Sequence, residues 1–90
     1  MRILVASNST SKRTDYFIKA GRSLGADTCF VTYDELSAVL PDCRDTVVKL
    51  EPPVFREADF RKYNLLCEEY RSLLSRLADM DKSESVHFLN

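Results

Sequence analysis

A run of seven polar and basic residues stands near the start of the chain, directly after a short apolar stretch. Residues 3–6 read ILVA and residues 7–13 read SNSTSKR, before any helical periodicity begins. A polar turn between a strand and a helix exposes backbone N–H groups and the positive end of the helix, and both attract anions. Lys12 and Arg13 would add positive charge to such a turn. The pattern therefore indicates a candidate contact for a carboxylate or a phosphate.

The same hydroxyl side chains have a second use, which is to cap the helix that follows. Ser9, Thr10 or Ser11 can accept a hydrogen bond from an N–H group of the first helical turn. In that case the two basic side chains that follow are solvated. The turn contains no glycine, so it matches neither the dinucleotide fingerprint G-x-G-x-x-G nor the phosphate loop G-x-x-x-x-G-K-[ST]. The cap and the anion contact stay open, whereas a dinucleotide site or a phosphate loop is disfavoured.

The remaining residues with reactive side chains favour structural roles. Cys29, Cys43 and Cys67 form no C-x-x-C pair and the chain has one histidine, His87, which excludes the usual zinc spacings. Three unpaired thiols predict a reducing, cytoplasmic location. His87 lies in a short apolar segment, where a packed or edge histidine is expected. Asp34 follows a predicted strand and is expected to cap a short helix. No nucleophile, acid/base pair or metal cluster emerges.

Length and charge limit the classes of partner. Ninety residues suffice for one domain with a single core. Thirteen basic side chains against 14 acidic ones give a formal net charge of −1, so nucleic acid is not an expected partner. The first apolar run is too short for a signal peptide, and no stretch approaches the roughly 20 apolar residues of a membrane span. No membrane partner is expected.

The order of the predicted elements indicates the fold. Strand patterns occur at 2–6, 28–32, 46–50 and 86–89, and the strongest helical pattern runs from about 58 to 80. Strands that alternate with helices form right-handed crossovers. The sequence predicts a three-layer α/β/α Rossmann-like domain, with a mainly parallel sheet of about four strands in the order 3-2-1-4 or a close variant.

The helical patterns carry three more specific expectations. Ala20 and Gly21 fall on the inward face of the first helix and would let it lie close to the sheet, while Gly25 suits the left-handed residue that ends it. Tyr63 and Tyr70 fall on the apolar stripe of the last helix, so both are expected to pack in the core.

The whole chain resembles the small Rossmann-like domain, called preATP-grasp, that precedes the nucleotide-binding lobes in ATP-grasp ligases. The stretches that carry the resemblance are MRILVASNSTSKRTDYFIKAGRSLGADTCFVTYDEL, VVKLEPPVFREADFRKYNLLCEEYRSLL and the closing HFLN. Its motifs are the order of strands and helices, the Ser/Asn turn, and a strand followed by Pro-Pro and a long helix. Asn90 matches a polar position that leads toward the ATP-binding lobes in that family.

The resemblance implies a function for the parent protein and a smaller one for this chain. Members of the family join a carboxylate to an amine through an acyl phosphate, using ATP and Mg²⁺, and the groups that bind these lie in later lobes. Residues 1–90 are therefore expected to be a single domain without catalytic, cofactor or metal residues of its own, and not an enzyme alone. Its expected partners are the missing C-terminal lobes and a small-molecule acceptor. The implied substrate-binding residues are Ser7, Asn8, Ser9, Ser11 and Arg13, with a contribution from the turn at Pro52-Pro53.

Two alternatives remain from the sequence. The chain also fits the N-terminal lobe of a glycosyltransferase, although those turns usually carry glycine, and it fits a free-standing binding module of flavodoxin-like topology. If the chain is a ligase domain, the strand at 86–89 ends at a cut edge. An apolar patch there would favour weak self-association into a homodimer.

Overall fold

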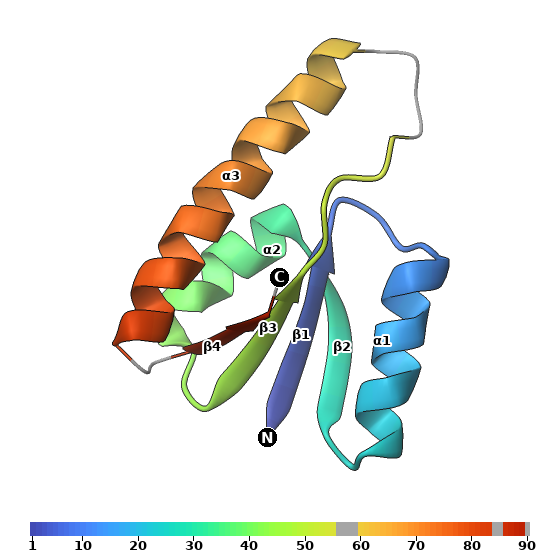
Figure 1. Cartoon of the computed structure of the whole chain (residues 1–90), viewed down its shortest axis with the longest axis vertical. Coiled ribbons are helices and arrows are strands. Elements are labelled where there is room, and N and C mark those ends of the chain that lie inside the picture. Colours follow the sequence, from blue (N-terminus) through green and yellow to red (C-terminus); the bar gives the residue numbers. More distant parts are fainter. Residues whose placement is uncertain (56–59, 84–85, 90) are drawn as a thin grey trace.

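The computed structural model describes residues 1–55, 60–83 and 86–89, and they form an α/β fold with one parallel sheet (Figure 1). The elements in chain order are β1 (Arg2–Ser7), α1 (Lys12–Ser23), β2 (Asp27–Thr32), α2 (Tyr33–Val39), a 3₁₀ turn (Leu40–Asp42), β3 (Thr46–Leu50), α3 (Phe60–Lys82) and β4 (Val86–Leu89). The predicted strands therefore exist within one residue of their expected bounds. The long helix was expected from about residue 58, which lies outside the described residues.

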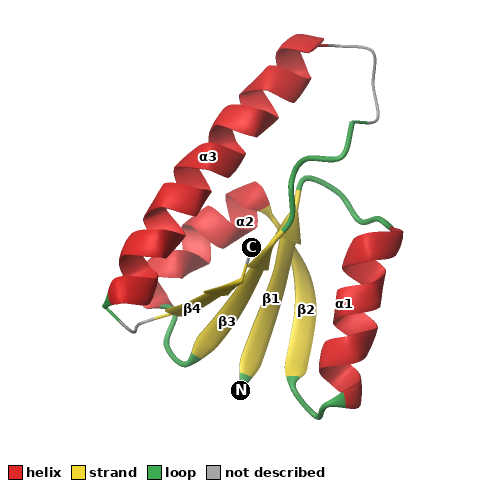
Figure 2. Cartoon of the chain, viewed as in Figure 1, coloured by secondary structure: helices red, strands yellow, loops and turns green. Residues whose placement is uncertain are grey.

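The sheet has the order β2-β1-β3-β4, and all three neighbouring pairs run parallel. Helix α1 covers one face, and α2 and α3 lie together on the other (Figure 2). The predicted three-layer α/β/α architecture is confirmed. The predicted strand order 3-2-1-4 was wrong, because β3 pairs with β1 and not with β2.

The main core lies between the sheet and the α2/α3 layer. Side chains alternate between the two faces along each strand, so Leu4 and Ala6 share one face with their register partners on β3, Val48 and Leu50. Helices α2 and α3, and the 3₁₀ turn that follows α2, contribute fully or largely buried leucines to the same cluster. Burial of each such side chain stabilises the fold by about 1.5–3 kcal/mol. The leucines concerned are Leu36, Leu40, Leu73 and Leu77.

Helix α1 approaches the opposite face through a glycine, as expected. An added Cβ at Gly21 would stand 2.3 Å from Oγ1 of Thr28 on β2, so no larger residue fits without a shift. Leu24 caps the C-terminal end of the helix, and Gly25 follows with a φ of 80°, the left-handed conformation that glycine adopts readily.

Helix α3 is longer than the strands that it covers. Its 23 residues span about 35 Å at 1.5 Å per residue, whereas the longest strands have 6 residues and span about 20 Å. Its buried residues, Leu73 and Leu77, both lie in the C-terminal half. The N-terminal half therefore extends beyond the carboxyl ends of the strands, as Figure 1 shows.

Candidate functional site

The strand order creates a topological switch point at the carboxyl ends of β1 and β3. From β1 the chain crosses through α1 to β2, and from β3 it crosses through α3 to β4 on the other side of the sheet. The two connections therefore diverge from adjacent strands. In open α/β sheets, ligands bind in the crevice at such a point. The Ser7–Arg13 turn and the Pro52-Pro53 segment meet there, so the two loops that the sequence singled out lie at one edge.

Asn8 joins these two loops. Its Oδ1 accepts a hydrogen bond from the N–H of Val54 at 2.8 Å, and its Nδ2 donates to the Val54 carbonyl at 3.1 Å. The buried hydroxyl of Ser7 lies 3.3 Å from the carbonyl oxygen of Pro52 and 3.2 Å from Asn8 Oδ1, within donating distance of both. Two of the expected substrate contacts, Ser7 and Asn8, thus hold the β3–α3 connection in place.

Ser11 is the residue that caps α1. Its hydroxyl accepts from the N–H of Thr14 at 3.3 Å, and Thr14 Oγ1 accepts from the N–H of Ser11 at 2.8 Å. This reciprocal pair is a capping box, and the buried Thr14 fixes it. The cap predicted among three hydroxyl residues is therefore confirmed for Ser11. Ser9 stays in the outer part of the turn, with its Oγ 3.5 Å from the Thr10 carbonyl.

Arg13 is not free, contrary to the solvated side chain expected if the turn only caps the helix. Its Nε lies 3.2 Å from Oε1 of Glu51, and Nζ of Lys49 lies 3.4 Å from the same oxygen. The side chain of Glu51 is 4% exposed, that of Lys49 12%, and that of Arg13 72%. The three groups carry a net charge of +1, and the basic group nearest to solvent is Arg13.

Lys49 has a second neighbour on α1. Its Nζ lies 5.0 Å from the centroid of the Phe17 ring, within the range of a cation–π contact. The ammonium group is thereby held between an aromatic face and the Glu51 carboxylate. This arrangement links β3 to α1 directly behind the polar turn.

Tyr33 supports the same edge from the α2 side of the sheet. Its hydroxyl donates to the backbone carbonyl of Glu51 at 2.6 Å, and burial raises the pKa of Tyr33 far above its ordinary value. Burial also raises the pKa of Tyr70, to which the nearby Glu51 charge contributes. Both phenols therefore remain protonated near neutral pH, and Tyr33 remains a hydrogen-bond donor.

Three aromatic side chains form a cluster at the N-terminal end of α3, and the sequence had predicted core packing for one of them, Tyr63. The Phe55 and Phe60 rings stack with centroids 5.8 Å apart, and Tyr63 meets Phe55 edge-on at 5.1 Å. Phe55 is 50% and Phe60 70% exposed, and Tyr63 is half-buried. Tyr63 thus packs in a surface cluster, because the part of α3 that carries it extends past the sheet.

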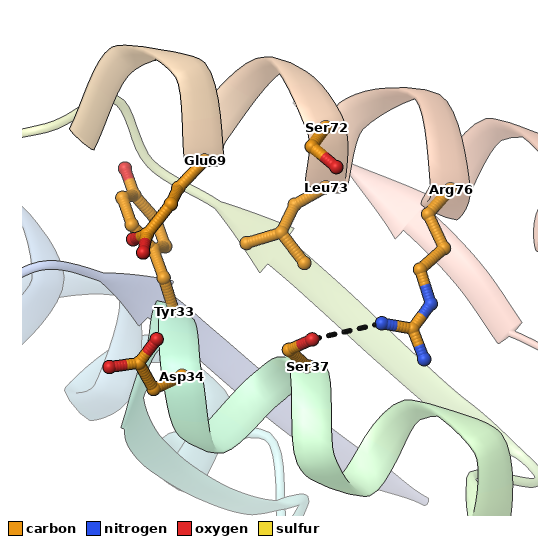
Figure 3. A pocket seen from close by; sticks show the side chains of 7 residues that line it. All are labelled: Tyr33, Asp34, Ser37, Glu69, Ser72, Leu73 and Arg76. Carbon is orange, nitrogen blue, oxygen red and sulfur yellow. Dashed lines mark hydrogen bonds between the residues drawn. The ribbon is translucent and has the colours of Figure 1, made fainter. Parts of the chain in front are cut away.

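A polar groove separates α2 from α3 and has a volume of about 130 Å³. Figure 3 shows the carboxylates of Asp34 and Glu69 toward one end and Arg76 at the other, where it donates to Ser37 at 3.0 Å. The sequence suggested that Asp34 caps α2, but it does not. Thr32 does, because its hydroxyl accepts from the Glu35 N–H at 3.2 Å, and Asp34 lies in the first turn instead.

The three cysteines and the histidine lie in four different parts of the fold. Cys29, Cys43 and Cys67 are free thiols. His87 is exposed on β4, with Nδ1 4.0 Å from a carboxylate oxygen of Asp81. No group of three or more metal-ligating side chains forms within residues 1–55, 60–83 and 86–89. Over the same residues, no helix is both long and apolar enough to cross a membrane.

The geometry defines an α/β domain with a polar site of net positive charge at its switch point. Comparison of the chain with protein-family models, with curated proteins and with solved structures gives no match. The sequence indicated the turn as a candidate site but did not indicate Lys49 and Glu51 as parts of it. Glu51 directly follows a predicted strand, and this position was the available signal.

Proposed function

We propose that the chain is the N-terminal, substrate-side domain of an ATP-dependent carboxylate–amine ligase of the ATP-grasp type. Its contribution is to hold an anionic group of the acceptor at the Ser9–Arg13 part of the turn. The observation that carries this proposal is the position of Arg13, which lies at the switch point with its side chain 72% exposed while its Nε pairs with Glu51.

The contacts around the turn suit an incoming carboxylate or phosphate oxygen. The first-turn N–H groups of α1 carry the positive end of the helix dipole, and Arg13 supplies N–H donors from a fixed position. The Glu51 carboxylate neutralises one of its two cationic neighbours, so the site keeps one positive charge. Such a site binds a single anionic group and does not form a multidentate phosphate cage.

The expected substrate residues divide into two groups on this proposal. Ser9 and Arg13 contact the acceptor. Ser7, Asn8 and Ser11 position the turn, because their side chains join it to the β3–α3 connection or cap α1. The resemblance assigns ATP, Mg²⁺ and the chemical step to later lobes, so this domain does not catalyse the reaction alone. Three free thiols support a cytoplasmic setting.

The strand order favours a second candidate, a free-standing binding module. The order β2-β1-β3-β4 is the flavodoxin-like one, in which β1 stands between β2 and β3. The dinucleotide-binding order, with β2 between β1 and β3, is not found. A free-standing module would use the same turn for a small anion, without an attached ATP-binding lobe.

Nuclear magnetic resonance titration of the ¹⁵N-labelled chain tests the anion site. Acetate and inorganic phosphate serve as separate probes, at constant ionic strength. We expect saturable shifts of the amides between Ser9 and Thr14, and their loss in Arg13→Ala. Lys19→Ala, an exposed cation on the same helix, is the matched control and should bind as the parent does.

Two results would contradict the anion site. One is the absence of saturable shifts with both probes, and the other is an equal loss of binding in Arg13→Ala and Lys19→Ala. The ligase assignment needs a longer chain that includes the ATP-binding lobes. There, Arg13→Ala should raise the KM for the acceptor and leave the KM for ATP unchanged, since only acceptor binding loses a contact.

A further inference from the structure

The N-terminal half of α3 presents a charge pattern that is complementary to itself. Arg61 and Lys62 precede Leu65 by four and three residues, and Glu68 and Glu69 follow it by three and four. All five side chains are exposed, and Leu65 is 61% exposed. The helix therefore carries a basic pair, an exposed leucine and an acidic pair, in that order.

Helix geometry places these side chains on one face. At 3.6 residues per turn, Arg61 and Glu68 lie on one flank of Leu65, and Lys62 and Glu69 lie on the other flank. Each opposite-charge pair on a flank is seven residues, or about 10.5 Å, apart along the axis. Pairing within one helix is therefore out of reach for these two combinations, whereas a second helix that runs the opposite way brings them together.

We propose that a second copy of this chain docks on this face, with the two α3 helices antiparallel and crossing at Leu65. A two-fold axis then places the two Leu65 side chains against each other. Arg61 of each copy lies opposite Glu68 of the other, and Lys62 lies opposite Glu69. Four ion pairs thus surround one apolar contact. The proposal does not depend on the function assigned above.

The charge pattern also selects the orientation. In a parallel pair, residues at equal heights face each other, so the basic pair of one copy would lie beside the basic pair of the other. The acidic pairs would repel in the same way. Like charges in direct opposition exclude a partner orientation, and complementary flanks favour one. Only the antiparallel arrangement is attractive on both flanks.

The groove between α2 and α3 extends the acidic half of this surface. Asp34 and Glu69 both line it, and Figure 3 shows their carboxylates at the same end of the groove. Among the described residues, neither carboxylate takes part in an ion pair. In the antiparallel pair, Lys62 of the second copy approaches Glu69 from the overhanging end of α3. Its ammonium group then lies near both carboxylates.

The extent of this face predicts a weak and salt-sensitive pair. About three turns of helix from each copy take part. The surface area that they bury is therefore well below the 1,200–2,000 Å² that stable interfaces bury. Exposed ion pairs add little each and are screened by salt. We expect a dissociation constant on the order of 0.1–1 mM at low ionic strength, with rapid exchange.

Sedimentation equilibrium at protein concentrations up to about 1 mM tests the docking face. The parent chain should show a mass that rises toward the dimer, and Leu65→Ser should remain monomeric over the same range. Leu24→Ser is the matched control, because Leu24 is 86% exposed at the end of α1, away from this face, and should behave as the parent does. Circular dichroism establishes that each variant is folded.

Charge reversal tests the partner and the orientation. Arg61→Glu/Lys62→Glu and Glu68→Lys/Glu69→Lys should each be monomeric alone and should associate when mixed. Sodium chloride should weaken association of the parent. A parent chain that stays monomeric at about 1 mM would overturn the proposal. The same holds if Leu65→Ser associates as the parent does, if the mixed variants fail to associate, or if salt strengthens the parent dimer.

Discussion

At the scale of single residues, Glu51 decides how the switch point holds together. Its nearly buried carboxylate pairs with Lys49, which is 12% exposed, and with Arg13, which is 72% exposed. Removal of Glu51 leaves Lys49 largely buried beside Phe17 without its anion. Removal of Arg13 leaves the Lys49 pair intact. The two ends of the same ion pair are therefore expected to differ in energetic importance.

We predict that Glu51→Ala lowers the free energy of unfolding by about 3 kcal/mol, the loss seen when a buried charge is left unpaired. Arg13→Ala should lower it by less than about 1 kcal/mol, as exposed ion pairs do. Urea unfolding followed by circular dichroism gives both values. Equal costs for the two variants would show that Lys49 does not depend on Glu51.

The buried phenol of Tyr33 makes the free energy of unfolding depend on pH in the alkaline range. Burial raises the pKa of Tyr33 in the folded chain, whereas in the unfolded chain it ionises near pH 10. Below that pH both states keep the proton and stability does not change through this group. Above it, only the unfolded state releases the proton, so the free energy of unfolding falls.

The test is urea unfolding between pH 8 and 11. The parent should lose stability above pH about 10. Tyr33→Phe should lose less over the same interval, because it lacks the Tyr33 phenol, and the remaining loss comes from Tyr70. At pH 8 the variant should already be less stable by about 1 kcal/mol, since it lacks the hydrogen bond to the Glu51 carbonyl. Identical slopes in both proteins would exclude Tyr33 as the source of the loss.

The sequence allowed prediction of local roles at this scale but not of long-range partners. The cap at Ser11 was predictable, because it depends on a local bond to Thr14, three residues away. The bond between Arg13 and Glu51 joins residues 38 positions apart and exists only because β3 lies beside β1. The wrong strand order therefore concealed this pair, although Arg13 lies at the start of a predicted helix and Glu51 directly follows a predicted strand.

At the scale of elements, the contact of α1 with β2 depends on the absence of a side chain. We predict that Gly21→Ala lowers the free energy of unfolding by about 1–3 kcal/mol, because its Cβ would overlap Thr28. Thr28→Ala in the same chain should recover much of that loss. The double-mutant cycle, measured by urea unfolding, should show a clear coupling energy. Additive effects would mean that α1 shifts freely over the sheet.

The strand order shows what patterns of single elements leave out. Each strand was recognisable, and the continuous apolar run of β1 suits its central position between two parallel neighbours. The composition of β2 contained the missing information. Asp27, Thr28 and Thr32 make half of its six residues polar, which suits an edge strand and not the interior place that the order 3-2-1-4 required.

At the scale of the whole molecule, the two faces of the sheet are covered unequally. Helices α2 and α3 pack over one face, whereas α1 contacts β1 and β2 on the other. On that second face, Val47 pairs in register with His87, and Lys49 pairs with Leu89, which is 55% exposed. The α1 side of β4 is thus an accessible surface near the switch point. A further lobe of a ligase, on the proposal made above, would have room to pack there.

The final prediction concerns the affinity of the whole chain for nucleotide. The turn at the switch point lacks glycine, its Asn8 amide is occupied by Val54, and the group of Arg13, Lys49 and Glu51 carries a net charge of only +1. A triphosphate needs closely spaced backbone N–H groups and several cations, and this edge offers the exposed side chains of Lys12 and Arg13 and one helix end. Calorimetric titration with magnesium-ATP should therefore give a dissociation constant weaker than about 10 µM, or less than ~6.8 kcal/mol of binding free energy. Inorganic phosphate at equal ionic strength is the control. In the nuclear magnetic resonance titration it should shift the same amide signals as ATP. Tighter binding of ATP, retained in Arg13→Ala, would place a nucleotide site elsewhere on the chain and would reverse the division of labour between this domain and later lobes.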